Sequence, residues 1–230
     1  MLTLALESSA KPASVAVCSD GDLLAQYFQN SGLTHSRTLL AMTESMLKNL
    51  DIAATDLGAI AVARGPGSFT GVRIGVSAAK GLAWGLGIPV CGVSTLEAMA
   101  HQAPNIGALV CPVMDARRGQ VYNAMFEWRD GIPVRLCEDR AVSLEELAAD
   151  LKDRASPCLL LGDGAMISYE HLSSEGLTCG IATGLVRFQT AFGVALAARD
   201  AETIPAIELE PSYLRPSQAE RNKAKRGEES

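Results

Sequence analysis

The chain has 230 residues, of which 48% are hydrophobic and only 5% aromatic. This length is enough to bury a substantial core, and the composition is typical of an α/β protein. The formal net charge of −6 excludes a strongly basic protein that binds nucleic acid through its own charge. Any role in RNA chemistry therefore requires a partner that provides most of the contact with the RNA.

The six cysteines and the N-terminal stretch both indicate a cytoplasmic protein. No two cysteines are spaced Cys-x-x-Cys, and most lie in apolar runs, so we expect buried thiols, with disulfides or a zinc site as the alternatives. The N-terminal stretch has no basic region, and Glu7 interrupts its apolar run, which argues against a signal peptide. No apolar run approaches the ~20 residues that span a bilayer. We expect no contact with a membrane.

The first half of the chain predicts three strands and then alternating helices and strands. The Asp20-Gly21 pair is typical of a hairpin turn between the second and third strands. Ser94, followed by Glu97 three residues later, matches a capping box at the start of a short helix. Apolar runs place the strands at 2–8, 13–19, 22–29, 58–65 and 88–93, and apolar periodicity places the longer helices at 35–50 and 71–87.

The second half repeats this order, with a capping box at Ser143 and Glu146. Its expected strands are 108–117, 120–128, 132–142 and 157–164, and its expected helices are 143–154 and 185–199. The order βββαβα thus occurs twice, which predicts an α/β protein with the duplicated ribonuclease-H-like fold of the actin-like ATPase and sugar-kinase group. Pro104 and Gly107 mark the boundary. We expect an N-terminal subdomain at 1–103, a C-terminal subdomain at 104–218 and a mobile charged tail at 219–230.

The stretch RGPGSFTGVRIG, residues 64–75, lies between an expected strand and an expected helix, where backbone N–H groups can hold an anion. Its Gly-x-Gly-x-x-x-Gly pattern lacks the Lys-Ser/Thr end of a P-loop. Pro66 removes one N–H donor, and Phe69 stands where a phosphate loop favours a small residue. A structural or partner-facing turn is therefore favoured over nucleotide binding.

Two acids, Glu7 and Asp115, end the first strand of each half. In an actin-like fold these positions flank the nucleotide cleft, which makes the two residues candidates for a vestigial nucleotide site. Asp115 has a simpler alternative, because it can pair with Arg117 or Arg118 across a tight connection. The three histidines are far apart and form no metal motif, and no hydrolase nucleophile motif is present. We expect no catalytic residue, no cofactor and no bound metal.

The helices expected at 35–50 and 71–87 are apolar over much of their circumference. A helix buried on its own sheet is the simpler explanation for 35–50, and the alternative is a second face that packs on a partner subunit. In the helix at 71–87, small residues are spaced four apart, which allows another helix to approach closely. The residues expected at the partner interface are Leu39, Met42, Met46, Gly71, Val72, Gly75, Val76 and Ala79.

Four stretches together resemble one family: ALESSAKPASVAV, ARGPGSFTGVRIGVSAAKGLAWGLGIPVCGVSTLEAMA, MDARRGQVYNAMF and PSYLR. Through them the chain resembles the TsaB family, also called YeaZ, over most of its length. The resemblance implies a duplicated actin-like fold and a non-catalytic scaffold. This scaffold is required, with TsaD, TsaE and TsaC, to form threonylcarbamoyladenosine (t6A) at position 37 of tRNAs that read codons starting with A.

The resemblance also implies that the paralogue TsaD performs the chemistry. The TsaD metal motif is His-x-x-x-His, and the matching positions here are Thr95 and Met99, so this reaction is not carried over. The implied contacts are a heterodimer with TsaD through the helices at 35–50 and 71–87, a homodimer when TsaD is absent, and tRNA only through the complex. No protease activity is expected. The alternative is an actin-like ATPase or small-molecule kinase that uses Glu7, Asp115 and the glycine loop.

Overall fold

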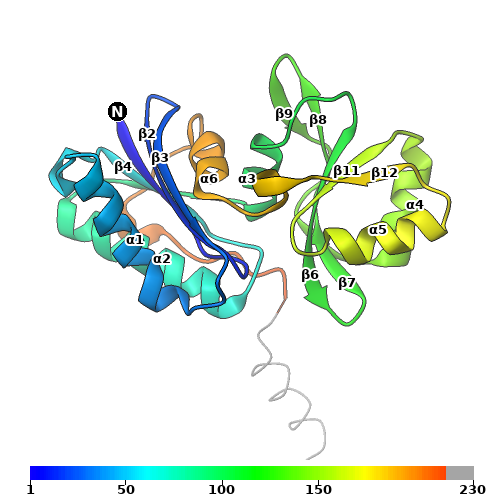
Figure 1. The fold of residues 1–230 in the computed structure, drawn as a ribbon, viewed down its shortest axis with the longest axis horizontal. Coiled ribbons are helices and arrows are strands. Elements are labelled where there is room, and N and C mark those ends of the chain that lie inside the picture. The colour runs from blue at the N-terminus through cyan, green and yellow to red at the C-terminus, as the bar shows by residue number, and fades with distance from the viewer. Residues whose placement is uncertain (216–230) are drawn as a thin grey trace, which may run out of the picture.

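Two β-sheets, one in each half of the chain, organise the structure, a computed structural model that describes residues 1–215 (Figure 1). The expected tail at 219–230 and the last residues of the expected second subdomain lie outside the described residues. Within 1–215, the helices are α1 (His35–Asn49), α2 (Phe69–Leu86), α3 (Thr95–His101), α4 (Leu144–Arg154), α5 (Ala165–Ser174) and α6 (Ala191–Ala198).

The first sheet has the strand order β3-β2-β1-β4-β5. Its strands are β1 (Leu2–Glu7), β2 (Ala13–Ser19), β3 (Asp22–Gln29), β4 (Ala59–Ala63) and β5 (Val90–Val93). The predicted hairpin turn between β2 and β3 is confirmed, because Asp20 and Gly21 both have positive φ, at 50° and 95°. Strand β1 pairs antiparallel with β2 and parallel with β4, so the carboxyl ends of β1 and β4 lie at one edge.

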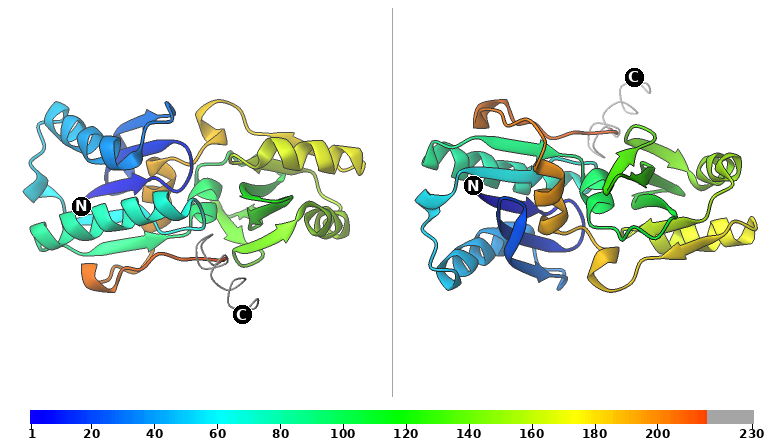
Figure 2. Two further views of the ribbon diagram at one scale, coloured as in Figure 1. Left: turned by 90° about the horizontal axis from the view of Figure 1, so that it is seen from below. Right: turned by 90° about the horizontal axis from the view of Figure 1, so that it is seen from above.

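The two faces of the first sheet differ in side-chain size. Leu4 and Leu6 of β1 belong to the core shared with α1 and α2, whereas Ala5 between them belongs to the core shared with α6. The alanine face lets α6 lie close to the strands, because small side chains allow close packing. Helices therefore cover both faces of this sheet, with α1 and α2 on one side and α6 on the other (Figures 1 and 2).

The second sheet repeats the order of the first as β10-β7-β6-β11-β12, with the hairpin β8-β9 added beside β6. Its strands are β6 (Leu109–Arg117), β7 (Gln120–Asn123), β8 (Phe126–Arg129), β9 (Ile132–Arg135), β10 (Arg140–Ser143), β11 (Cys158–Leu161) and β12 (Cys179–Ile181). Helices α4 and α5 lie beside this sheet (Figure 1). The repeated order confirms the predicted duplicated ribonuclease-H-like fold of the actin-like group.

Each of the two long strands expected at 120–128 and 132–142 is divided into two strands. The partner of β6 changes from β7 to β8 next to Pro112, which has no N–H to continue the ladder. The buried Asn123 side chain occupies this break and donates to the Pro112 and Ala124 carbonyl oxygens at 3.1 and 2.9 Å. The break therefore depends on a contact between β6 and β7, which cannot be recognised from the local sequence of either strand.

The helix expected at 185–199 is also interrupted. A 3₁₀ turn at Gly184–Arg187 is followed by extended residues, and α6 begins after Thr190. The side chain of Gln102, the residue that follows α3, holds the segment between the 3₁₀ turn and α6 in place, because its amide donates to the Val186 carbonyl oxygen at 3.1 Å and also to that of Phe188. The contact joins two segments that are distant in sequence.

The chain returns to the first half after residue 190. Helix α6 packs on β1, β2 and β4, and Ile204 forms an antiparallel bridge with Val90 of β5. The segment 204–215, which we call the C-terminal strap, continues across the first half. These segments fall within the 104–218 subdomain expected from the sequence, but they pack with the N-terminal sheet. A single boundary in the sequence cannot describe this arrangement, because the chain returns to the first half near its end.

Candidate functional site

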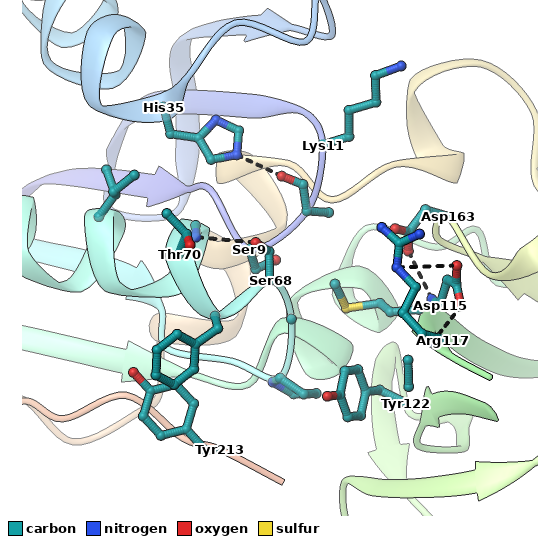
Figure 3. Close-up of a pocket in the computed structure, with 18 of the residues that line it drawn as sticks. Ser9, Lys11, His35, Ser68, Thr70, Asp115, Arg117, Tyr122, Asp163 and Tyr213 are labelled. Atoms are coloured by element: carbon teal, nitrogen blue, oxygen red, sulfur yellow. Dashed lines mark hydrogen bonds and ion pairs between the residues drawn. The ribbon is translucent and has the colours of Figure 1, made fainter. Parts of the chain in front are cut away.

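A cleft with a volume of about 560 Å³ lies between the two halves, as Figure 3 shows. Ser9, Lys11, His35, Ser68 and Thr70 line it from the first half. Asp115, Arg117, Tyr122 and Asp163 line it from the second half, and the strap contributes Tyr213 and Arg215. The acids thus stand on one side of the cleft and most of the hydroxyl groups on the other.

The glycine loop forms part of this cleft, and its glycines are needed for close packing inside the chain. A side chain at Gly65, where φ is +119°, would collide with the carbonyl oxygen of Ser212 in the strap. A side chain at Gly67 would collide with the carbonyl oxygen of Ser9. The Ser68 N–H donates to that same Ser9 oxygen at 2.6 Å, and the Ser68 hydroxyl caps α2. The loop is therefore a closely packed turn that starts α2.

Glu7 and Asp115 are not brought together in the cleft. Asp115 lines it, whereas Glu7 is fully buried behind it. Burial raises the pKa of Glu7 to about 7, although its carboxylate accepts a hydrogen bond from the Ser9 N–H at 2.5 Å. Among the described residues, the second carboxyl oxygen of Glu7 has no hydrogen-bond partner. Glu7 is therefore not placed to bind a ligand from the cleft.

Asp115 lies next to a second acid that the sequence analysis missed. Its N–H donates to the Asp163 carboxylate at 3.4 Å, and its own carboxylate accepts from the Arg117 N–H at 2.7 Å. The cleft walls partly desolvate Asp163 and raise its pKa, and the neighbouring charge of Asp115 acts in the same direction. The Gly-Asp-Gly stretch at 162–164 is the sequence feature that indicates this acid. It directly follows β11, which runs parallel to β6, so Asp163 and Asp115 lie at the same edge of the sheet.

The positions that match the His-x-x-x-His motif do not line the cleft. Thr95 and Met99 are both buried in α3, and Met99 packs in a hydrophobic cluster with residues of the second half. Within residues 1–215, no group of three or more His, Cys, Asp or Glu side chains is arranged to hold a metal ion. Over the same residues, no helix combines the length and apolar character needed to cross a bilayer.

Seven of the eight residues expected at a partner interface are buried inside this chain, which corrects that expectation. Leu39, Met46, Val72, Val76 and Ala79 are at most 3% exposed and belong to the core of the first half. Gly71 and Gly75 are small because they lie against Ser8 at the end of β1. Met42 is the only one of the eight that is partly exposed. A helical wheel identifies an apolar arc but does not show which part of it faces the sheet.

The outward surfaces of α1 and α2 carry other residues. A groove of about 610 Å³ runs between the two helices, and it is lined by His35, Ser36, Leu39, Leu40, Phe69, Thr70, Arg73, Ile74, Ser77 and Ala78. Leu40 beside the groove is 49% exposed, and Trp84 further along α2 is 74% exposed. We call the exposed residues of α1 and α2 around this groove the outward face.

Gly81 and Gly85 lie on the exposed side of α2 and have no role inside the described part of the chain. No atom lies within 4 Å of the position that a Cβ would occupy at either residue. A glycine in a helix interior destabilises the helix by roughly 0.5–1 kcal/mol relative to alanine. The two glycines therefore leave a flat strip on α2. They lower the stability of the helix, and no packing contact within the described residues explains their presence.

Comparisons with known proteins agree with the fold and the motifs. A family model described as TsaD, tRNA N6-adenosine threonylcarbamoyltransferase, matches residues 29–157. The chain is 34% identical over 221 residues to the tRNA threonylcarbamoyladenosine biosynthesis protein TsaB of Bacillus subtilis, with 96% of each chain covered. It is 31% identical to TsaB of Haemophilus influenzae, with 92% of each chain covered. The structure resembles YeaZ from Pseudomonas aeruginosa, with a TM-score of 0.78 and 29% identity over 93% of this chain and 99% of that one. The chain belongs to the TsaB family.

Proposed function

We propose that this chain is a non-catalytic scaffold that activates TsaD, and that it is required with TsaD, TsaE and TsaC to form t6A at position 37 of tRNAs that read codons starting with A. The observation that carries the proposal is the outward face of α1 and α2, where Leu40 and Trp84 are exposed and α2 carries two exposed glycines that the described part of the isolated chain does not need. The cleft supports the same conclusion, because Glu7 is buried behind it and Thr95 and Met99 replace the metal-binding histidines of TsaD.

The outward face is the proposed surface for TsaD. The exposed glycines of α2 let a partner helix lie close to its backbone, and the groove between α1 and α2 accepts apolar side chains. The same face would be covered by a second copy of the chain when TsaD is absent. TsaE and tRNA then join through the TsaD complex in the cytoplasm, since a net charge of −6 does not favour direct binding to RNA.

A reconstituted reaction tests this function. TsaC, TsaD, TsaE, ATP, threonine, bicarbonate and unmodified tRNA are mixed with and without this chain, and t6A is quantified. We expect product only when the chain is present, and no product from the chain alone. Equal product without the chain would show that it is not a required subunit.

Paired variants test the surface. Ile74→Glu places a charge in the groove, and the exposed Ile132→Glu in the second half serves as the matched control. We expect only Ile74→Glu to abolish the heterodimer in size-exclusion chromatography, while both variants keep the wild-type circular dichroism spectrum. An unchanged heterodimer with Ile74→Glu would exclude this surface.

One observation favours a second candidate, an actin-like ATPase or small-molecule kinase. The Ser9 hydroxyl is buried at the edge of the cleft beside the Glu7 carboxyl group, and among the described residues no hydrogen bond of ordinary geometry satisfies it. A phosphate oxygen is one group that would satisfy it. Calorimetric titration of the isolated chain with Mg-ATP tests this candidate, and tight binding that is lost in Ser9→Ala would favour it over the scaffold.

A further inference from the structure

We infer that the groove between α1 and α2 takes an acidic helical segment of the partner, with Arg73 as the residue that pairs with a partner carboxylate. The inference rests on the proposed function, because it specifies which kind of TsaD segment binds to the outward face. It goes further by assigning a charge to the partner and a role to the C-terminal strap.

Arg73 is held in place by two aromatic rings from separate parts of the chain. Its guanidinium carbon lies 3.8 Å from the centroid of the Phe69 ring, which is a cation–π contact. Its Nε donates to the Tyr213 hydroxyl of the strap at 2.8 Å. The Phe69 and Tyr213 rings are themselves stacked, with centroids 4.8 Å apart. The first turn of α2 and the strap therefore fix the guanidinium together.

The fixed guanidinium has no acidic partner within residues 1–215, since no ion pair formed by these residues includes Arg73. Its two terminal nitrogens remain available to a carboxylate. A guanidinium binds a carboxylate through two parallel hydrogen bonds, and a fork that is already oriented loses less entropy when it does so. This geometry suits recognition of a carboxylate from outside the chain.

The rest of the groove specifies how that carboxylate is presented. Among the described residues that line the groove, Arg73 is the only Lys, Arg, Asp or Glu, and Leu40, Ile74 and Ala78 provide apolar surface beside it. A ligand that matches the groove has an apolar side chain and an acid on the same side. In a helix, residues three or four apart meet this requirement.

Two other occupants match the groove less well. The residues after 215 contain four Lys or Arg and three Glu, so they would bring more positive than negative charge to Arg73. A second copy would present α1 and α2, which contain Arg37, Lys48, Arg73 and Lys80 but only one acid, Glu44. Like charges across an interface oppose association. The charge of the face therefore favours an acidic heterologous partner over a second copy.

Binding to TsaD, measured by calorimetry at low and at high salt, tests the inference. We expect Arg73→Glu to weaken the heterodimer by about tenfold or more, because it replaces an attraction with a repulsion. Arg154, an exposed arginine on α4 in the second half that forms no ion pair with the described residues, provides the charge-matched control Arg154→Glu, which should have no effect. Wild-type affinity should fall with added salt, whereas the affinity of Arg73→Glu should fall less or rise, because salt screens the new repulsion.

The Tyr213→Phe variant tests the role of the strap as a positioning element. It keeps the stacked ring but removes the hydroxyl that accepts from Arg73. We expect a smaller loss of affinity than in Arg73→Glu, and no further loss when Tyr213→Phe is added to Arg73→Ala. A full additional loss in the double variant would show that Tyr213 acts independently of Arg73.

The outcomes separate this inference from the proposed function. If Ile74→Glu abolishes the heterodimer while Arg73→Glu behaves like Arg154→Glu, the acidic partner segment is excluded and the scaffold role stands. If Arg73→Glu weakens only self-association, a second copy is the occupant and the inference is overturned. If neither Ile74→Glu nor Arg73→Glu affects the heterodimer, the proposed surface itself is wrong.

Discussion

The Ser8 hydroxyl donates a hydrogen bond of 2.9 Å to the carbonyl oxygen of Gly71, which joins the end of β1 to the first turn of α2. Both residues are buried. In place of a ligand site, the glycines on this side of α2 allow the helix to lie directly on the β1 loop. Helix α2 therefore carries two kinds of glycine: Gly71 and Gly75 pack against Ser8, whereas Gly81 and Gly85 are exposed. Substitution by alanine distinguishes the two kinds.

Gly75→Ala should destabilise the fold. A Cβ at this position would lie 2.5 Å from the Ser8 hydroxyl, so either the hydroxyl would have to turn away and lose its hydrogen bond to the Gly71 carbonyl oxygen, or the end of β1 and α2 would have to move apart. Overpacking of this kind costs about 1–3 kcal/mol. Urea unfolding followed by circular dichroism measures the change, and a midpoint equal to wild type would show that the contact adapts without cost.

Gly81→Ala should have the opposite effect on stability and should weaken assembly. The added methyl group meets no atom within 4 Å, so the isolated chain should gain about 0.5–1 kcal/mol from the higher helix propensity of alanine. The same methyl group would hold a partner helix away from α2. A variant that is more stable in urea but binds TsaD as tightly as wild type would show that Gly81 is not part of the interface.

Glu7→Gln should change how stability depends on pH. Because burial raises the pKa of Glu7 from its ordinary 4.5 to about 7, the folded chain holds this proton more tightly than the unfolded chain. The stabilisation is complete below pH 4.5 and is lost as the pH rises through about 7. The loss corresponds to on the order of 3 kcal/mol. Glu7→Gln should not show it.

Unfolding free energies of wild type and Glu7→Gln at pH 5 and pH 8 measure this effect. The glutamine keeps the oxygen that accepts from the Ser9 N–H, so the two chains differ mainly in the titrating group. The variant should gain stability relative to wild type as the pH rises. The same difference at both pH values would show that Glu7 does not titrate in this range.

Local signals in the sequence predicted most elements where the controlling contacts are also local. Ser143 and Glu146 form the expected capping box, with hydrogen bonds of 3.1 and 2.7 Å. Ser94 caps α3 as expected, but the Glu97 side chain does not complete that capping box. It pairs with Arg135 of β9 at 3.0 Å, because the fold brings a cation next to it. Tertiary contacts of this kind are not visible in a window of a few residues.

The candidate site was predicted less well, for a related reason. The sequence identified α1 and α2 as unusually apolar, but the burial of Met46 and the exposure of Trp84 depend on where the sheet lies. Helix α5 and β12 were not expected, since their apolar pattern is weak. The strap residue Tyr213 reaches Phe69 only because the chain crosses back to the first half. Family resemblance supplied the fold and the family, but not these contacts.

Arg215→Ala should loosen the connection between the two halves. The Arg215 guanidinium donates to the Ala116 carbonyl oxygen at 3.0 Å and to the Gln120 side chain, and it thereby ties the strap to the β6–β7 turn. The preceding strap residue Ser212 donates its N–H to the Arg64 carbonyl oxygen at 2.7 Å, in the glycine loop of the first half. Without Arg215, the remaining hydrogen bonds from the strap to other segments of residues 1–215 would all go to the first half.

Hydrogen exchange of the backbone amides measures this loosening. Exchange should become faster at 115–120 in Arg215→Ala and remain unchanged in α1, while Arg129→Ala, at an exposed arginine of the second half, should leave both regions unchanged. Arg215→Lys should restore little protection, because a lysine ammonium lacks the planar fork that reaches two acceptors at once. Unchanged exchange at 115–120 in Arg215→Ala would show that the other contacts between the halves, including those of α3, hold them together without Arg215.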